Sequence, residues 1–237
     1  MEYFVDWNCR LIPSAKNQRM TVDAVSSALQ TLHQRDRISH FCMMNEYSGS
    51  FGSIPAYMIL WEKTCRELRA ASPKQIKLRF ATSVPFYSGL HQLRDVDRLC
   101  IGDRCLLPIT LPLAPYADWI DAELNALLYQ AHITPMFLSF DLSILLYPEE
   151  VFQKLLRISN AVYQFSYKSL TNPKVLEQIR YVLSENPTAT ILLGTTLASL
   201  KDVSFHETSY YLKRASELLP PMEFQMLLHH GRAFWRS

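Results

Sequence analysis

The sequence predicts an α/β fold in which parallel strands form a closed or nearly closed barrel with helices outside it. Short apolar runs alternate with helix-length amphipathic segments along the chain, which is typical of parallel strands joined by helices. About seven such units favour a barrel over an open sheet. No glycine-rich dinucleotide turn follows the first strand, which counts against a Rossmann arrangement. The chain of 237 residues contains no repeat or linker, so we expect one domain over residues 1–237.

Periodicity and turn residues place the elements of the first half. Thr21 precedes apolar residues at helical spacing, and the glycine- and serine-rich stretch 47–53 is typical of a loop. The expected elements are, in order, a strand at 3–5, a helix after Thr21, a strand at 38–44, a helix at 54–71 and a strand at 76–84.

The second half continues the alternation. Gly102-Asp103 is a turn signal between two apolar runs, and Pro148 followed by two glutamates is a typical helix start. The expected elements are a hairpin over 99–111, a helix at 115–132, a strand at 135–140, a helix from 148, a strand at 161–165, a helix at 173–185, a strand at 189–193, and closing helices at 205–219 and 221–230.

Composition excludes several classes of protein. A net charge of +2 and a pI near 8.2 give no electrostatic support for a nucleic-acid or membrane partner. No apolar run is long enough to span a membrane, and the N-terminus does not resemble an export signal. The five scattered cysteines are therefore expected to be reduced thiols, and we expect a cytoplasmic protein.

The carboxyl ends of the strands are where a barrel builds its active site. The polar residues expected there are mainly amides and hydroxyls, with one cation and a few carboxylates: Asp6, Asn8, Arg10, Asn45, Glu46, Thr82, Ser83, Thr110, Ser139, Asp141, Gln164, Ser166, Thr195 and Thr196. A catalytic transition metal needs several histidine and carboxylate ligands at one point. The seven histidines fall on helices, in loops or at the start of a strand, so we expect no metal and no other cofactor.

Arg10 is the residue of this set that says most about function. A guanidinium near a barrel axis must be paired or must face a solvent-filled space. One interpretation is a structural ion pair with Asp6, Glu46 or Asp141, and the other is a clamp for an anion. Cys9 lies beside Arg10, but alternation along the strand would place it against a helix as a packed apolar residue.

The order of features resembles the PHP (polymerase and histidinol phosphatase) superfamily, and within it the manganese-dependent tyrosine phosphatases of capsule and exopolysaccharide operons. The first strand of that family contains Asp-x-His-x-His and is followed by Ile-Leu-Pro, where this chain has Asp6, Asn8, Arg10 and Pro13. The resemblance covers nearly the whole chain. It implies a distorted (β/α)7 TIM-like barrel.

The same resemblance implies that the metal ligands are absent. Asn45 replaces a histidine, Ser83 and Thr110 replace glutamates, and Ser139 replaces another histidine. The stretch 193–198 matches the family's Ala-Ser-Asp-Ala-His without either of its ligands. Metal-activated attack on a phosphate ester needs the cations to form the nucleophile and to hold the phosphoryl oxygens.

The leading hypothesis is therefore a catalytically inactive, binding or regulatory PHP-like module. Its candidate pocket would accept an anionic small molecule or a phosphorylated peptide, and consists of Asn8, Arg10, Asn45, Ser83, Thr110, Ser139, Asp141 and Thr196. The alternative is a hydrolase with residual or relocated chemistry that uses Asp141, Glu46 or Asp6 as acid and base. A third interpretation is a purely structural partner, for example an oligomer subunit paired with an active relative. A homo-oligomer is a further expectation.

Overall fold

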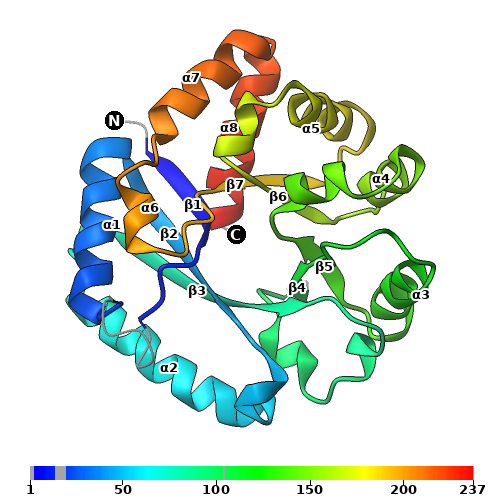
Figure 1. Cartoon of the computed structure of the whole chain (residues 1–237), viewed down its shortest axis with the longest axis horizontal. Helices are drawn as coiled ribbons and strands as arrows, with labels where there is room; N and C mark the ends of the chain where they lie inside the picture. Colours follow the sequence, from blue (N-terminus) through cyan, green and yellow to red (C-terminus); the bar gives the residue numbers. More distant parts are fainter. Residues whose placement is uncertain (1–2, 14–19, 104, 237) are drawn as a thin grey trace.

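Seven parallel strands form one sheet in chain order, as the computed structural model shows for residues 3–13, 20–103 and 105–236 (Figure 1). The sheet curves into a nearly closed barrel, which confirms the predicted fold class. The strands are β1 (Phe4–Cys9), β2 (Ile38–Glu46), β3 (Lys77–Pro85), β4 (Leu106–Thr110), β5 (Thr134–Phe137), β6 (Val162–Ser166) and β7 (Thr190–Gly194).

Helices surround this sheet and connect its strands (Figure 1). The α-helices are α1 (Val22–Asp36), α2 (Ile54–Ala71), α3 (Trp119–Asn125), α4 (Glu149–Leu156), α5 (Pro173–Glu185), α6 (Leu200–Val203), α7 (Thr208–Leu218) and α8 (Pro221–Arg236). Short helical turns lie between them: η1 (Gly49–Phe51), η2 (Leu90–Gln92), η3 (Val96–Leu99), η4 (Ala126–Gln130), η5 (Phe140–Leu145) and η6 (Lys168–Thr171). No helix in the described part of the chain combines the length and apolar character that crossing a membrane requires.

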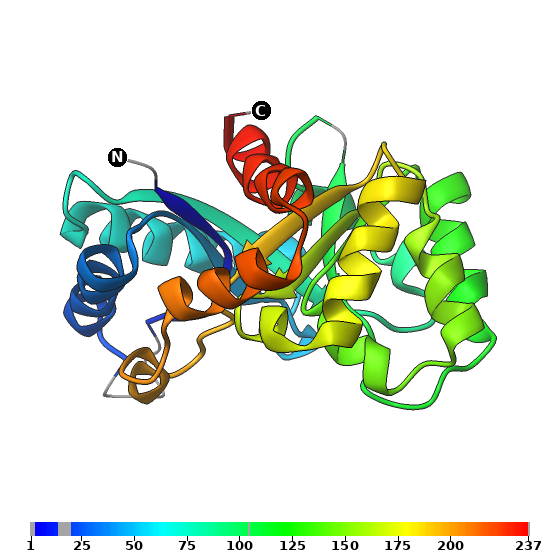
Figure 2. The ribbon, with the colours of Figure 1, turned by 90° about the horizontal axis from the view of Figure 1, so that it is seen from above.

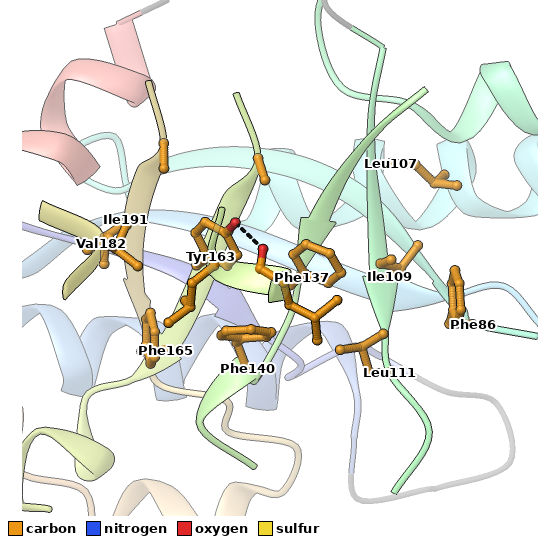
Figure 3. Packing of buried hydrophobic residues seen from close by; sticks show 14 of the residues in the cluster. Phe86, Leu107, Ile109, Leu111, Phe137, Phe140, Tyr163, Phe165, Val182 and Ile191 are labelled. Carbon is orange, nitrogen blue, oxygen red and sulfur yellow. Dashed lines mark hydrogen bonds between the residues drawn. The ribbon is translucent and has the colours of Figure 1, made fainter. Parts of the chain in front are cut away.

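Apolar side chains fill both faces of the sheet. Inside the barrel, Trp7 packs with residues from the other strands, including Met44 and Met136. Outside, aromatic side chains of β5 and β6 form a layer beneath the helices, and Figure 3 shows Phe137 and Tyr163 in this layer. The buried Tyr163 hydroxyl donates to the Leu155 carbonyl oxygen of α4 at 2.7 Å, so the layer leaves no polar group of this tyrosine unpaired.

The barrel closes between β1 and β7 only near the carboxyl ends of these strands. The Thr196 amide donates to the Asn8 carbonyl oxygen at 2.9 Å, and the Arg10 amide donates to the Leu197 carbonyl oxygen at 2.9 Å. Nearer the amino ends, the Ile191 amide of β7 donates instead to Nδ1 of His230 in α8 at 3.2 Å. We call this junction the seam. Because its amino half is filled by a helix rather than by strand pairing, the barrel is distorted.

Helix α8 lies against the seam on the side of the molecule opposite α6 (Figure 2). The Trp7 indole donates to the Gly231 carbonyl oxygen at 3.1 Å, and the Trp7 ring packs edge-on against Phe234 and Trp235. The sequence placed the end of this helix near residue 230. It continues to Arg236 because its last turns cover the apolar end of the barrel interior.

Several predicted boundaries were wrong. The helix expected at 115–132 begins at Trp119 and ends in a π-helical turn, η4. The strand expected at 135–140 ends at Phe137, because Ser139 adopts a left-handed backbone with φ of 48°. The hairpin over 99–111 reduces to a single antiparallel bridge between Ile101 and Leu106. Helix α6 was not predicted, since its four residues are too few to show periodicity.

Candidate functional site

An irregularity in β1 sets the position of the first site residues. Asp6 pairs with Phe41 and Cys9 pairs with Met43, so β1 has one residue more than β2 over this interval. Such an extra residue breaks strict alternation of side chains. Trp7 lies in the interior cluster and Cys9 in the outer cluster with α1, as expected for Cys9. Asn8 lies between them, fully buried, and reaches side chains of the opposite strands.

Asn8 belongs to a buried amide network whose orientation is fixed by the backbone. Oε1 of Gln164 accepts from the Ser139 amide at 2.8 Å, and Nε2 of Gln164 donates to the Phe165 carbonyl oxygen at 2.6 Å. Asn8 must therefore present its Nδ2 to Gln164 Oε1, at 2.7 Å. Its Oδ1 is buried and has no partner among the described residues. An unsatisfied buried acceptor is costly and marks a place for a donor from water or a ligand.

Arg10 lies at the mouth of the barrel with two weak contacts. Its Nη2 is 3.5 Å from Glu46 Oε2 and 3.3 Å from Ser83 Oγ. The Arg10 side chain keeps 30% of its surface exposed and that of Glu46 keeps 45%. Of the three carboxylates considered as its structural partner, the structure brings Glu46 to Arg10. A long, solvent-exposed pair of this kind contributes at most about 1 kcal/mol to stability.

Asn45 contacts the Tyr57 hydroxyl rather than Arg10. The Tyr57 hydroxyl of α2 hydrogen-bonds with Thr82 at 3.1 Å and with the Asn45 side chain. Burial raises the pKa of Tyr57 to about 12. Alternation along β2 then directs the neighbouring Glu46 to the side of Arg10. The structure therefore joins Asn45 to the layer between β2, β3 and α2, and joins Ser83 to Arg10.

The remaining predicted pocket residues lie at other strand ends. Thr110 ends β4, and its hydroxyl is buried without a partner among the described residues. Asp141 accepts from the Ser166 amide at 3.1 Å, and burial raises the pKa of this carboxyl. Thr196 follows β7 in a left-handed backbone with φ of 56°, and its hydroxyl donates to the Thr195 carbonyl oxygen.

Asp6 has its hydrogen bonds within the seam. One carboxylate oxygen accepts from the amides of Asn8 and Thr195, at 3.0 and 2.9 Å, and the other accepts from the Thr195 hydroxyl at 2.5 Å. The residue is fully buried, and burial raises its pKa to about 6. Asp6 therefore connects the carboxyl ends of β1 and β7, and none of these hydrogen bonds involves the Arg10 side chain.

The donor set at the strand ends does not suit a divalent cation. Within residues 3–13, 20–103 and 105–236, no three histidine, cysteine, aspartate or glutamate side chains converge on one point. The side chains that do converge are the amides of Asn8 and Gln164 and the guanidinium of Arg10 with Ser83. A fixed positive charge repels a metal ion, and amides are poor ligands for transition metals. The residues present therefore do not fit the metals that the family resemblance would imply.

Comparison with known proteins identifies the fold. A solved structure described as that of YwqE from Bacillus subtilis and CpsB from Streptococcus pneumoniae, unique metal-dependent tyrosine phosphatases, superposes with a TM-score of 0.60. The alignment covers 96% of this chain and 95% of the other, at 13% sequence identity. The fold is that of the metal-dependent tyrosine phosphatases. No family model and no curated protein matches the sequence.

This similarity confirms the resemblance drawn from the sequence at the level of the fold. The two chains correspond over nearly their full lengths, although only 13% of their residues are identical. The shared barrel architecture therefore tolerates nearly complete replacement of side chains. The chemistry at the strand ends must be argued from this chain's own residues.

Two strand-end residues outside the predicted pocket contact residues within it; the sequence named Glu46 among three candidate partners of Arg10 but assigned no role to Gln164. Gln164 orients Asn8, and Glu46 contacts Arg10. Both lie at the carboxyl ends of strands, so their position in the chain was a usable signal. Their partners are 156 and 36 residues away in sequence, however, and only the barrel closure brings them together.

Proposed function

We propose that this chain is a non-catalytic PHP-like module that binds an anionic group at the mouth of its barrel. Arg10 supplies the positive charge, Ser83 supplies a hydroxyl, and Asn8 forms the floor. The anion would be a phosphate or carboxylate group of a small molecule or of a phosphorylated peptide. Guanidinium groups suit such anions because they offer paired, charged donors in a fixed plane.

The observation that carries this proposal is the weak engagement of Arg10. A guanidinium committed to structure would form short, paired contacts with a carboxylate. Arg10 instead has one contact of 3.5 Å with a half-exposed glutamate and one of 3.3 Å with a serine hydroxyl. An incoming anion could displace Glu46 at little cost, because an exposed ion pair of this length contributes little.

The test is calorimetric titration of the purified chain with inorganic phosphate and with phenyl phosphate. Arg10→Ala should weaken binding by about ten- to a hundredfold, which corresponds to the roughly 1.5–3 kcal/mol of a hydrogen bond to a charged group. The melting temperature should stay nearly unchanged. Arg94→Ala is the matched control, because the side chain of Arg94 is 95% exposed and its ion pair is with the neighbouring Asp95.

Two outcomes would contradict the proposal. Equal binding by wild type and Arg10→Ala would show that the anion binds elsewhere. A large fall in the melting temperature of Arg10→Ala would favour a structural role for this residue. Hydrolysis of phenyl phosphate during the titration, followed with and without manganese, would favour the alternative of a hydrolase.

A further inference from the structure

A cavity lies beside the carboxyl ends of β6 and β7, and we call it the side cavity. It has a volume of about 250 Å³ and is lined by Ser166, Lys168, Thr196, Asp202, Phe205 and Tyr211, among others. Its walls come from η6, from the segment after β7, and from α6 and α7 with their connection. The volume is slightly below the roughly 300–1,000 Å³ of common ligand pockets, so it suits a small molecule.

The floor of the side cavity is polar and rigid. Thr195, His206 and Ser166 line it and are buried. His206 is held by a 2.8 Å hydrogen bond between its Nε2 and Thr208, and burial lowers its pKa to about 4, so it is neutral near pH 7. Ser166 Oγ accepts from the Lys168 amide at 3.1 Å, and its own hydrogen has no acceptor among the described residues. The floor therefore adds hydrogen-bonding groups without adding charge.

Opposite charges line this cavity from different walls. Lys168 belongs to η6, and Asp202 belongs to α6. Neither forms an ion pair with any other residue in the described part of the chain, and so they are not paired with each other. Two separated, unpaired charges of opposite sign complement a ligand that carries both charges itself.

The rim of the cavity carries an exposed aromatic ring. Phe205 is 81% exposed, the highest exposure among the large apolar side chains in the described ranges, and it lies one turn beyond Asp202. An aromatic face beside a carboxylate is a favourable surface for an ammonium group. Thr196, in its left-handed backbone, lines the same cavity, and strained positions of this kind gather at ligand sites.

We propose that the side cavity binds a small zwitterion, namely a free α-amino acid. Its carboxylate lies at Lys168 and the Ser166 hydroxyl, and its ammonium group lies at Asp202 and Phe205. The mouth of the barrel plays no part in this contact, so the inference stands independently of the proposed anion site at Arg10.

The test uses the full chain and the twenty standard L-amino acids, screened by thermal shift and then by calorimetric titration. At least one amino acid should bind and raise the melting temperature. Its carboxamide and its N-acetyl derivative each lack one of the two charges, and each should bind about tenfold more weakly or worse. Lys168→Met and Asp202→Asn should weaken binding of the parent amino acid by a similar factor.

Two matched controls establish whether the amino acid binds in the side cavity. Lys174→Met removes an exposed lysine from α5 and should leave binding unchanged. Arg10→Ala should also leave amino-acid binding unchanged. The proposed anion site at Arg10 and the proposed amino-acid site in the side cavity can therefore fail independently. Both site residues are exposed, so their variants should keep the wild-type melting temperature without ligand. Binding by no amino acid, or binding that survives both Lys168→Met and Asp202→Asn, would overturn the proposal.

Discussion

Asp6 shows how a single buried carboxylate connects the first and last strands of the barrel. The aspartate begins the strand motif that resembles the PHP family, where the residues after it are histidines. Here its carboxylate accepts from the Asn8 amide of its own strand and, across the seam, from the amide and the hydroxyl of Thr195. These contacts favour the ionised form, but complete burial outweighs them and raises its pKa from 3.8 to about 6.

The raised pKa predicts a specific dependence of stability on pH. Well below pH 4, Asp6 is protonated in both the folded and the unfolded chain, and the folded state is then most stable with respect to this residue. As pH rises through about 6 the unfolded chain has already lost the proton, so folding is disfavoured by roughly 3 kcal/mol relative to acid. Burial lowers the pKa values of His40 and His206 to about 4, so these histidines act in the opposite direction.

Comparison with Asp6→Asn isolates this residue from the histidines. The asparagine can keep the oxygen that accepts both amides and donate its Nδ2 to Thr195, without an ionisation cost. Its unfolding free energy, measured in urea, should rise relative to wild type by roughly 3 kcal/mol between pH 3 and pH 7. The exposed Asp103→Asn serves as control. A constant difference between Asp6→Asn and wild type at both pH values would contradict the assigned pKa shift.

At the scale of elements, the seam between β1 and β7 sets the geometry of the candidate site. It brings Asn8 and Arg10 beside the segment after β7, through backbone bonds to Thr196 and Leu197. Gly194 makes this approach possible. A Cβ at this position would lie 2.7 Å from the Asn8 nitrogen and 2.9 Å from the Asn8 Cβ.

Gly194→Ala should therefore force the two strands apart. Backbone atoms lie in the way and cannot rotate aside as a side chain can, so we expect a loss of about 2 kcal/mol or more in unfolding free energy. Gly231→Ala is the matched control, because its Cβ would meet only the Trp7 ring, at 3.5 Å, within a helix that alanine favours. Chemical denaturation measures both variants. Equal stability of the two would show that the seam is looser than described.

The elements themselves were predictable to different degrees. The strands and long helices could be placed because apolar periodicity reports directly on which face is buried. The end of β5 could not, since the left-handed backbone of Ser139 has no glycine or asparagine to announce it. The role of His230 was missed because its partner, the Ile191 amide, is 39 residues away in the sequence. Two histidines expected at a helix end lie within α8, and one of them accepts the free amide of β7.

At the scale of the whole molecule, the sequence predicted the barrel and the identity of the strand-end residues. It did not predict Gln164 as the partner of Asn8, and it left three candidate partners for Arg10, of which Glu46 is the one in contact. The fold follows from the alternation of elements and is confirmed by a solved structure at 13% identity. The pairing of Asn8 with Gln164, or of Arg10 with Glu46, depends on how far the barrel twists and closes. Such contacts join distant segments, and no local pattern encodes them.

The barrel presents a fixed cation and amides at the strand ends, where the family resemblance would place metal ions. Elemental analysis of the full chain, purified without a histidine tag or chelators, tests this most directly, before and after incubation with manganese. We predict far less than one transition-metal ion per chain in both samples, because Arg10 occupies the mouth and no three suitable ligands converge among the described residues. Two or three tightly bound ions per chain would contradict this prediction and would make a metal-dependent phosphatase the better description.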